Sequence, residues 1–400
     1  MGGAPRASTP GLLGVTLTLR EGTATRMDNC AVENDVLLVV VGAGASYATV
    51  GDGDSLLQVE GLPTVLPSDA RPPLTQGLVG PGLLQDQILA RYPMAKPLVA
   101  ELRDVLASPS PRVVAPFEQL LADYERSAAD NPARRRHLMA LRFYLRDLLW
   151  ACTDYSTQPG MGSGMTRYHR LVNELHHWAH LHGRHVCFVV FNYDLILENA
   201  CRDVFGFAID DLSSHVTHPL VSVVKPHGSV NWVWPVQRGS QFGSRALADE
   251  TVIRDAAADS TPPLGSIAVA PAPPHRKWMG TAPTAVPALA LPVAGKSEFV
   301  WPEAHESFVR DRLRTRVRGV LTLGWRGMEP HFLDLLPPLV REGSRLALVT
   351  GGPTAQRDAD ELSQRLVGTL SPAAARVATD NSGLPTTLRS HLEWIEPGFS

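Results

Sequence analysis

A continuous apolar run followed at once by a glycine-rich turn is the feature that most constrains the fold of this chain. Val36–Val41 reads VLLVVV, and Gly42–Ser46 (GAGAS) comes directly after it. Strands that are apolar at every position are typical of parallel sheets, which helices cover on both faces. A strand that ends in Gly-Ala-Gly lets the backbone turn tightly and approach a diphosphate. Tyr47 replaces the third glycine of the dinucleotide fingerprint, so an ordinary strand–helix turn stays an alternative.

Five further runs of apolar, β-branched residues predict additional strands. They are His185–Phe191, Val221–Val224, Val320–Gly324, Leu346–Thr350 and Ala375–Ala378. Between residues 81 and 183 the apolar positions instead recur at helical spacing, with charged residues between them. Strands that alternate with helices predict an α/β fold: a Rossmann-like parallel sheet with helices on both faces and a helical insertion.

These patterns divide the chain into three expected regions. Residues 1–35 form a flexible N-terminal segment, and its sequence leaves open whether translation starts at Met1 or Met27. Residues 36–80 and 184–400 form the Rossmann-like core, and residues 81–183 form the helical insertion. Residues 236–298 are rich in Pro, Ala, Gly and Ser, which predicts loops over the active face.

Composition and cysteine spacing narrow the classes of function. The chain has 400 residues, of which 44% are hydrophobic and 19% charged, as in ordinary globular proteins. A net charge of −3 gives no support for direct binding to nucleic acid. No apolar run reaches the roughly 18 residues of a membrane span, and the amino terminus lacks the pattern of a secretion signal. The four cysteines form no CxxC pair, which argues against a structural zinc site and fits a reducing cytoplasm.

Polar side chains follow the strand predicted at residues 185–191. Asn192 and Asp194 lie two residues apart at its carboxyl end, where open α/β sheets bind ligands. An amide and a carboxylate at this spacing can both point to one side of an extended turn. Capping of the helix that begins near Leu195 is the structural alternative.

The stretch VVKPHGSVNW, residues 223–232, places a histidine at the end of the next strand. Pro226 cannot donate to a strand ladder, and Gly228 frees the backbone just after His227. An imidazole with an unperturbed pKa of about 6.5 suits a base at neutral pH, and a satisfied loop histidine is the structural alternative. The strand that ends at Gly324 is followed by Glu329-Pro330, which starts another helix.

Taken in order, these motifs resemble those of the sirtuin family, and most closely the sirtuin-like domains of bacterial anti-phage defence systems. Those domains typically read GAGAS, PPLT, an aromatic-Asn-Tyr-Asp turn, KLHGS and GYSxxD/EP. The matching stretches here are Gly42–Ser46, Pro72–Thr75, Phe191–Asp194, Lys225–Ser229 and Gly324–Pro330, within residues 36–350. This chain departs from the pattern at Pro226, in the loose motif GWRGMEP, and in lacking the four-cysteine zinc module of protein-deacylating sirtuins.

The resemblance implies roles for individual residues around NAD⁺. His227 would act as the general base, Asn192 would hold the ribose and position water, and Asp194 would bind the nicotinamide carboxamide. The other residues implied in binding are Gly42, Ala43, Gly44, Ala45, Ser46, Gly228, Ser229, Gly324, Trp325 and Glu329. No metal ligand is among them, and no zinc is expected.

The implied activity is hydrolysis of the nicotinamide–ribose bond of NAD⁺, as substrate, to nicotinamide and ADP-ribose. The enzyme would deplete NAD⁺ in the cytoplasm as the effector of an anti-phage (abortive infection) system. The resemblance also implies a homo-oligomer and a partner that senses infection, such as a translocase-type ATPase, an argonaute-like protein or a phage component. A non-catalytic sensor of NAD⁺ or ADP-ribose is an alternative, which the presence of Asn192, Asp194 and His227 together disfavours. An ADP-ribosyltransferase would use the same residues and stays open.

Three other features carry weaker signals. His176 and His180 are four residues apart on a predicted helix, where a solvated face is favoured over a shared metal because no acidic or sulfur partner is evident. The basic run at residues 133–137 predicts a solvated helix face, with a docking patch as the alternative. Trp232 and Trp234 either wall the site or have a core or rim role.

Overall fold

The computed structural model describes most of the chain from residue 34 onward. The described residues are 34–50, 55–107, 116–157, 166–236, 244–256, 266–270, 273–275, 284–293, 299–352, 354–370, 372, 374–379 and 384–399. Of the expected N-terminal segment 1–35, only residues 34 and 35 fall inside these ranges, and Met27 lies outside them.

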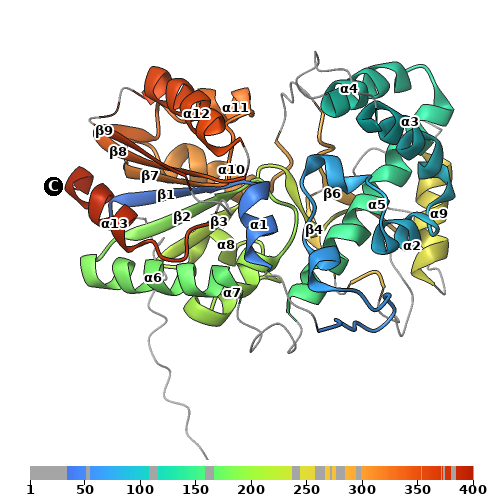
Figure 1. Cartoon of the computed structure of the whole chain (residues 1–400), viewed down its shortest axis with the longest axis horizontal. Helices are drawn as coiled ribbons and strands as arrows, with labels where there is room; N and C mark the ends of the chain where they lie inside the picture. Colours follow the sequence, from blue (N-terminus) through green and yellow to red (C-terminus); the bar gives the residue numbers. More distant parts are fainter. Residues whose placement is uncertain are drawn as a thin grey trace, which may run out of the picture. The chain divides into compact units, whose positions relative to one another are not determined.

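Six parallel strands form the main sheet, in the order β3-β2-β1-β7-β8-β9 (Figure 1). Their bounds are β1 Val36–Val41, β2 His185–Val190, β3 Val221–Val224, β7 Val317–Leu323, β8 Val340–Thr350 and β9 Ala374–Thr379. All six predicted strands are confirmed, although β7 and β8 begin earlier than predicted. Every residue of β1 and β2 is buried, which is why their sequences are apolar without alternation.

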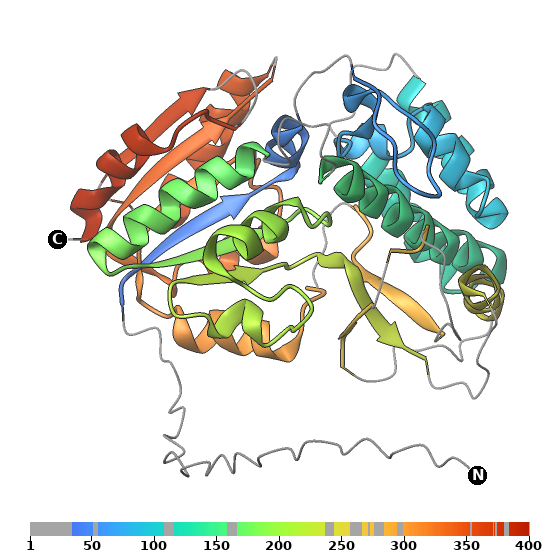
Figure 2. The same cartoon turned by 90° about the horizontal axis from the view of Figure 1, so that it is seen from below.

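Helices cover both faces of this sheet, as the strand sequences predicted. Alternate residues of β1 enter two different cores: Leu37, Val39 and Val41 in one, Val36, Leu38 and Val40 in the other. The first core is completed by α6 (Arg167–His182), α7 (Ile196–Phe205) and α13 (Arg389–Ile395), and the second by α11 (Pro330–Leu335), α12 (Ala355–Leu370) and the π-helical turn η4 (Phe308–Arg312) (Figure 2). The fold is therefore α/β and Rossmann-like, as predicted.

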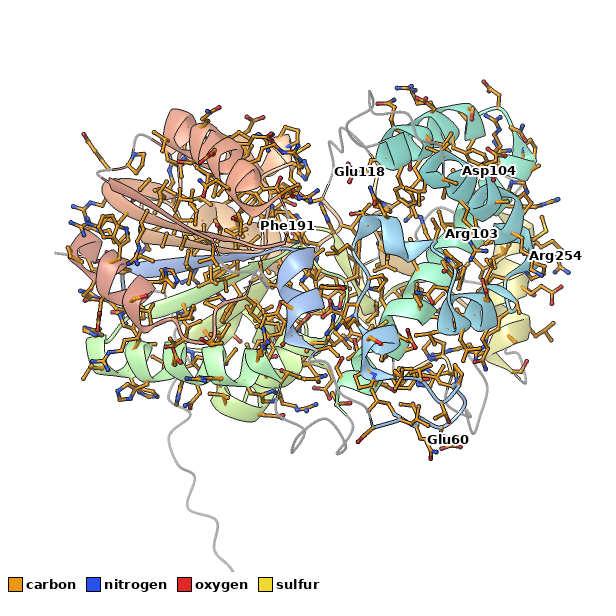
Figure 3. The ribbon with its side chains drawn as sticks, viewed as in Figure 1. Glu60, Arg103, Asp104, Glu118, Phe191 and Arg254 are labelled. Carbon is orange, nitrogen blue, oxygen red and sulfur yellow. The ribbon has the colours of Figure 1, made fainter. Side chains whose placement is uncertain are left out.

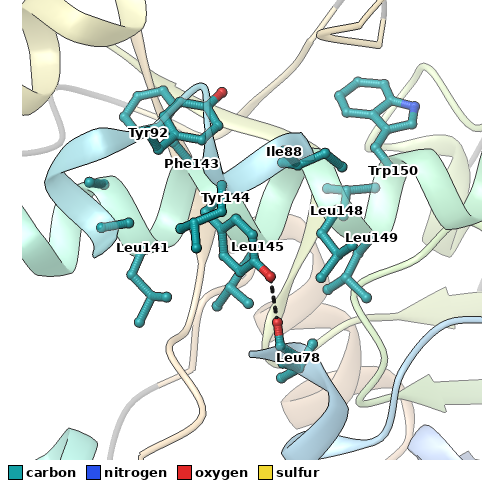
Figure 4. Close-up of a cluster of buried hydrophobic side chains, with 14 of the residues drawn as sticks. Leu78, Ile88, Tyr92, Leu141, Phe143, Tyr144, Leu145, Leu148, Leu149 and Trp150 are labelled. Atoms are coloured by element: carbon teal, nitrogen blue, oxygen red, sulfur yellow. Dashed lines mark hydrogen bonds between the residues drawn. The ribbon is translucent and has the colours of Figure 1, made fainter. Parts of the chain in front are cut away.

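A third core joins helices to a small second sheet. Its helices are α2 (Leu83–Leu89), α3 (Lys96–Ala107), α4 (Pro116–Ala128), α5 (Pro132–Ser156) and α9 (Arg245–Asp255). The antiparallel sheet has the order β5-β4-β6, with β4 Gly228–Pro235, β5 Ala268–Val269 and β6 Ala285–Leu289. Side chains of α5 fill the middle of this core, where the Tyr144 hydroxyl donates to the Leu78 carbonyl at 2.8 Å (Figure 4).

The remaining short elements connect these layers. They are α1 (Ala43–Thr49), η1 (Pro67–Ala70), η2 (Thr75–Leu78), η3 (Pro93–Ala95), α8 (Ser214–Thr217), α10 (Glu303–Ser307) and η5 (Glu396–Phe399).

Two expectations differ from the structure. The helical insertion was expected over residues 81–183, but α6 packs in the core of the main sheet through Tyr168, Leu171, Val172 and Leu175. Loops were expected over residues 236–298, and this is wrong for α9, β5 and β6. These strands have only 2 and 5 residues, which is too short for a clear alternating pattern. Both pair with β4, which lies far from them in the sequence.

Replacing Gly228 by alanine is expected to destabilise the protein by about 3 kcal/mol or more. Gly228 has φ +82°, and an added Cβ would lie 1.9 Å from the backbone oxygen of Ala288 on β6. Gly343 is the matched control, because it has φ +84° but no atom within 4 Å of an added Cβ; alanine there should cost only about 1–2 kcal/mol. Urea unfolding of the two variants measures the difference, and equal losses would contradict the close contact with β6.

Candidate active site

The order of the parallel strands reverses between β1 and β7. In β3-β2-β1-β7-β8-β9 the chain first builds outward from β1 toward β3 and then continues on the other side with β7. Open α/β sheets bind ligands outside the carboxyl ends of the strands at such a reversal. The four sequence motifs directly follow β1, β2, β3 and β7, so the structure brings all four to one edge of the sheet.

Glycines let the ends of β1 and β7 approach each other closely. A Cβ on Gly42 would lie 2.5 Å from the oxygen of Gly324, and a Cβ on Gly324 would lie 2.5 Å from the nitrogen of Ala45. Gly324 also has φ +58°, a conformation that favours glycine. Ala43 is exposed and Gly44 half-buried, so this turn forms part of the surface at the strand reversal.

Asn192 is held by the glycine-rich turn. Its Nδ2 donates to the carbonyl oxygen of Gly42 at 3.0 Å and to Oγ of Ser46 at 2.6 Å. The Ser46 hydroxyl also bonds the Tyr168 hydroxyl of α6 at 3.2 Å, and Ser46 is only 2% exposed. Ser46, one of the residues implied in binding, thus orients Asn192. The other end of the amide, Oδ1, is buried and has no hydrogen-bond partner within the part of the chain that the structure describes.

His227 lies among aromatic rings at the ends of β2 and β3. Its ring centroid is 5.0 Å from that of Phe191, 6.1 Å from Tyr193 and 6.3 Å from His331. Phe191, labelled in Figure 3, directly follows β2. The backbone oxygen of His227 accepts a hydrogen bond from the backbone nitrogen of Ala290 at 2.9 Å, which ties the backbone of His227 to the loop after β6. His227 is 6% exposed, so its ring is largely shielded from solvent.

The residues after β7 complete the aromatic cluster. The ring of Trp325 stacks on Phe191 at 5.6 Å with an angle of 3° between the planes. Trp325 Nε1 donates to Oε2 of Glu329 at 2.7 Å. Trp325 is buried and Glu329 half-buried, so Glu329 orients Trp325 at the edge of the cluster.

Asp194 serves the structure of the turn. Its Oδ1 accepts from the backbone nitrogen of Ile196, the first residue of α7, at 3.1 Å, which is the helix-capping alternative. Its backbone oxygen accepts from Nζ of Lys225 at 2.5 Å, and the same Nζ pairs with Oε1 of Glu198 at 2.5 Å. Burial raises the pKa of the Asp194 carboxyl, and Lys225 acts in the opposite direction.

Gly228 and Ser229 belong to the second sheet. Gly228 pairs with Leu289 of β6, and the Ser229 hydroxyl donates to the backbone oxygen of Tyr193 at 3.4 Å. Both residues are buried. They were expected to contact NAD⁺, but their contacts here hold the turn that carries His227.

The weaker sequence signals have structural explanations. His176 and His180 contact each other edge-on at 4.5 Å on α6, and the described part of the chain has no group of three or more His, Cys, Asp or Glu residues placed to hold a metal ion. In the basic run, Arg135 donates to the Ala128 oxygen at the end of α4 at 3.2 Å. Trp232 is fully buried, which confirms its core alternative, whereas Trp234 is half-buried. Over the described ranges, no helix has both the length and the apolar character needed to cross a bilayer.

Three site residues were not expected from the sequence. Tyr168 reaches Ser46 from α6, Glu198 pairs with Lys225 from α7, and His331 adds a second imidazole from α11. None of the three had a recognisable local signal, because each contact joins residues at least 27 positions apart in the sequence.

No family model matches the chain, and no curated protein matches it. Among solved structures, the chain is similar to a mutant of a Sir2 homologue in complex with ADP-ribose, at 12% sequence identity and a TM-score of 0.29, over 85% of this chain and 94% of that chain. At that TM-score the likeness adds nothing to the fold assignment, which rests on the strand order.

Proposed function

We propose that this protein is an NAD⁺ hydrolase that cleaves the nicotinamide–ribose bond to give nicotinamide and ADP-ribose. The observation that carries the proposal is the position of the four motifs. They follow neighbouring strands at the reversal of an open parallel sheet, which is where this architecture binds nucleotides. The order of the same motifs along the sequence resembles the sirtuin-like domains named above.

The residues at the strand ends fit a dinucleotide. Buried polar atoms are nearly always hydrogen-bonded, so an unsatisfied one at a surface turn points to a missing partner. The buried Oδ1 of Asn192 is such an acceptor, and a ribose hydroxyl is a suitable donor. The half-buried Gly44 and exposed Ala43 leave the β1 turn open for a diphosphate.

The chemistry of NAD⁺ hydrolysis suggests roles for His227, Asn192 and the aromatic rings beside them. Nicotinamide is cationic in NAD⁺ and leaves as a neutral molecule, so its departure needs no general acid. Water that attacks the ribose carbon must lose a proton, and His227 is the base that accepts it. Asn192 holds the ribose, and the rings of Phe191 and Trp325 limit the access of bulk water to the reacting bond.

The physiological role in this proposal follows from the resemblance in motifs. The enzyme acts in the bacterial cytoplasm as the NAD⁺-depleting effector of an anti-phage system, gated by oligomerisation or by a partner that senses infection. ADP-ribosyl transfer differs only in the acceptor that replaces water, so the products distinguish the two activities.

Replacing Asn192 by alanine is expected to lower the rate of NAD⁺ cleavage by about 10²-fold, because the ribose loses its positioning contact. The test incubates the purified protein with NAD⁺ and separates nicotinamide and ADP-ribose by chromatography. Asn173, exposed on α6, gives the matched control Asn173→Ala, which should cleave at the wild-type rate.

If the purified protein does not cleave NAD⁺, calorimetry shows whether it binds NAD⁺. Binding without cleavage would favour the sensor alternative or an enzyme that awaits its partner. Absence of both binding and cleavage would contradict the proposed function.

A further inference from the structure

A cavity of about 380 Å³ lies beside the His227 cluster and is not used by the proposed reaction. Its walls include Trp234 of β4, Ile267 before β5, and the segment Phe299–Glu303 that leads into α10. Cavities of roughly 300–1,000 Å³ are typical of small-ligand sites. The backbone nitrogen of Val300 donates to the Pro226 oxygen at 2.7 Å, which joins the cavity wall to the turn that carries His227.

Three aromatic side chains line this cavity without being fully buried. Phe299 and Trp301 stack at 4.2 Å with an angle of 28° between their planes, and both are half-buried, as is Trp234. Trp232, on the same strand as Trp234, is fully buried in the core. Large aromatic rings that remain partly exposed around a cavity are typical of ligand sites, because their faces offer stacking surface at small cost in side-chain entropy.

The charge of the lining favours a cation. Among the described residues that line the cavity, Glu303 is the one ionisable group, and none of the ion pairs found between described residues involves it. An aromatic face carries partial negative charge and attracts a cation placed over it. A carboxylate beside three aromatic faces therefore attracts a positive ring and repels a phosphate or carboxylate ligand.

We propose that this cavity binds a small planar organic cation, which stacks on Trp301 and pairs with Glu303. The ligand would lie next to the proposed NAD⁺ site, because the Phe299 ring also contacts His331 at 4.4 Å, and His331 is 6.3 Å from His227. A volume of about 380 Å³ accommodates a small molecule of one or two fused rings.

The test measures binding of the N-methylquinolinium cation by calorimetry, with neutral quinoline as its isostere. Neither probe has a ribose or a carboxamide, so the result does not depend on NAD⁺ cleavage. The wild type is expected to bind the cation at least about tenfold more tightly than quinoline, a difference of about 1.4 kcal/mol that lies within the range of cation–π contacts.

Two variants separate the aromatic contribution from the charge. Trp301→Leu keeps an apolar side chain but removes the aromatic face, and it should weaken binding of the cation about tenfold. Glu303→Gln should also weaken it, whereas Glu306→Gln should not, because Glu306 pairs with Arg310 at 2.9 Å and does not line the cavity. The proposal is wrong if quinoline binds as tightly as the cation, if Trp301→Leu keeps wild-type affinity, or if the cation does not bind at millimolar concentration.

Discussion

The variant His227→Ala is expected to cleave NAD⁺ about 10²–10⁴ times more slowly than the wild type, which is the usual contribution of a positioned general base. The imidazole lies beside the rings of Phe191 and Tyr193, and the backbone oxygen of His227 is bonded to Ala290 in the loop after β6. Alanine removes the proton acceptor without changing these backbone contacts. Affinity for NAD⁺, measured by calorimetry, should therefore change much less than the rate measured by chromatography of nicotinamide.

Two other histidines make this experiment specific. His177 is exposed on α6, so His177→Ala should keep the wild-type rate. His331 is the second imidazole of the cluster, and His331→Ala shows whether proton transfer has been assigned to the correct ring. Full loss of cleavage in His331→Ala together with retained cleavage in His227→Ala would transfer the role of base to α11.

The main sheet was predictable from local sequence because its strands are buried on both faces. Val36–Val41 is apolar at each position, and each of its residues is buried in the structure. Since parallel strands end at one common edge, the same runs also predicted that the residues after them would meet. The strand order, which places β1 beside β7, was not contained in any single run of residues.

Individual contacts in the site depend on residues far apart in the sequence. Ser46 was named among the residues implied in binding NAD⁺. In the structure it bonds Tyr168, which is 122 positions away, and Asn192, which is 146 positions away. The residues next to Ser46 are the same whether its hydroxyl faces a ligand or the protein interior, so the local sequence does not reveal its orientation. Only the packing of α6 on the sheet decides that Ser46 points inward.

The second sheet was missed for a similar reason. Loops were expected over residues 236–298 and no strand was predicted between Val224 and Val320, yet Gly228–Pro235 pairs with β5 and β6. In the sequence, Gly228 was explained by the conformational freedom that glycine gives the backbone after Pro226 and His227. In the structure the Ala288 backbone oxygen leaves no room for a Cβ, and no local pattern reveals that contact.

Replacing Lys225 by methionine is expected to lower the free energy of unfolding by about 3–5 kcal/mol, because it leaves a buried carboxylate without its counter-charge. Lys225 and Glu198 are both 0% exposed, and their Nζ and Oε1 atoms are 2.5 Å apart. Urea unfolding measures the loss. Removing both charges, in Lys225→Met with Glu198→Leu, should restore much of the stability, since apolar pairs commonly replace buried ion pairs at little cost.

The pH dependence of the single variant identifies the cause of its instability. Burial raises the pKa of Glu198, and Lys225 counteracts this, so without Lys225 the folded state holds a proton that the unfolded state releases. Stability of Lys225→Met should then fall as pH rises above the unfolded-state pKa of about 4.3, and its deficit should shrink as pH is lowered toward that value. A deficit that is independent of pH and persists in the double variant would instead be due to the lost bond from Nζ of Lys225 to the backbone oxygen of Asp194, which joins the end of β3 to the turn after β2.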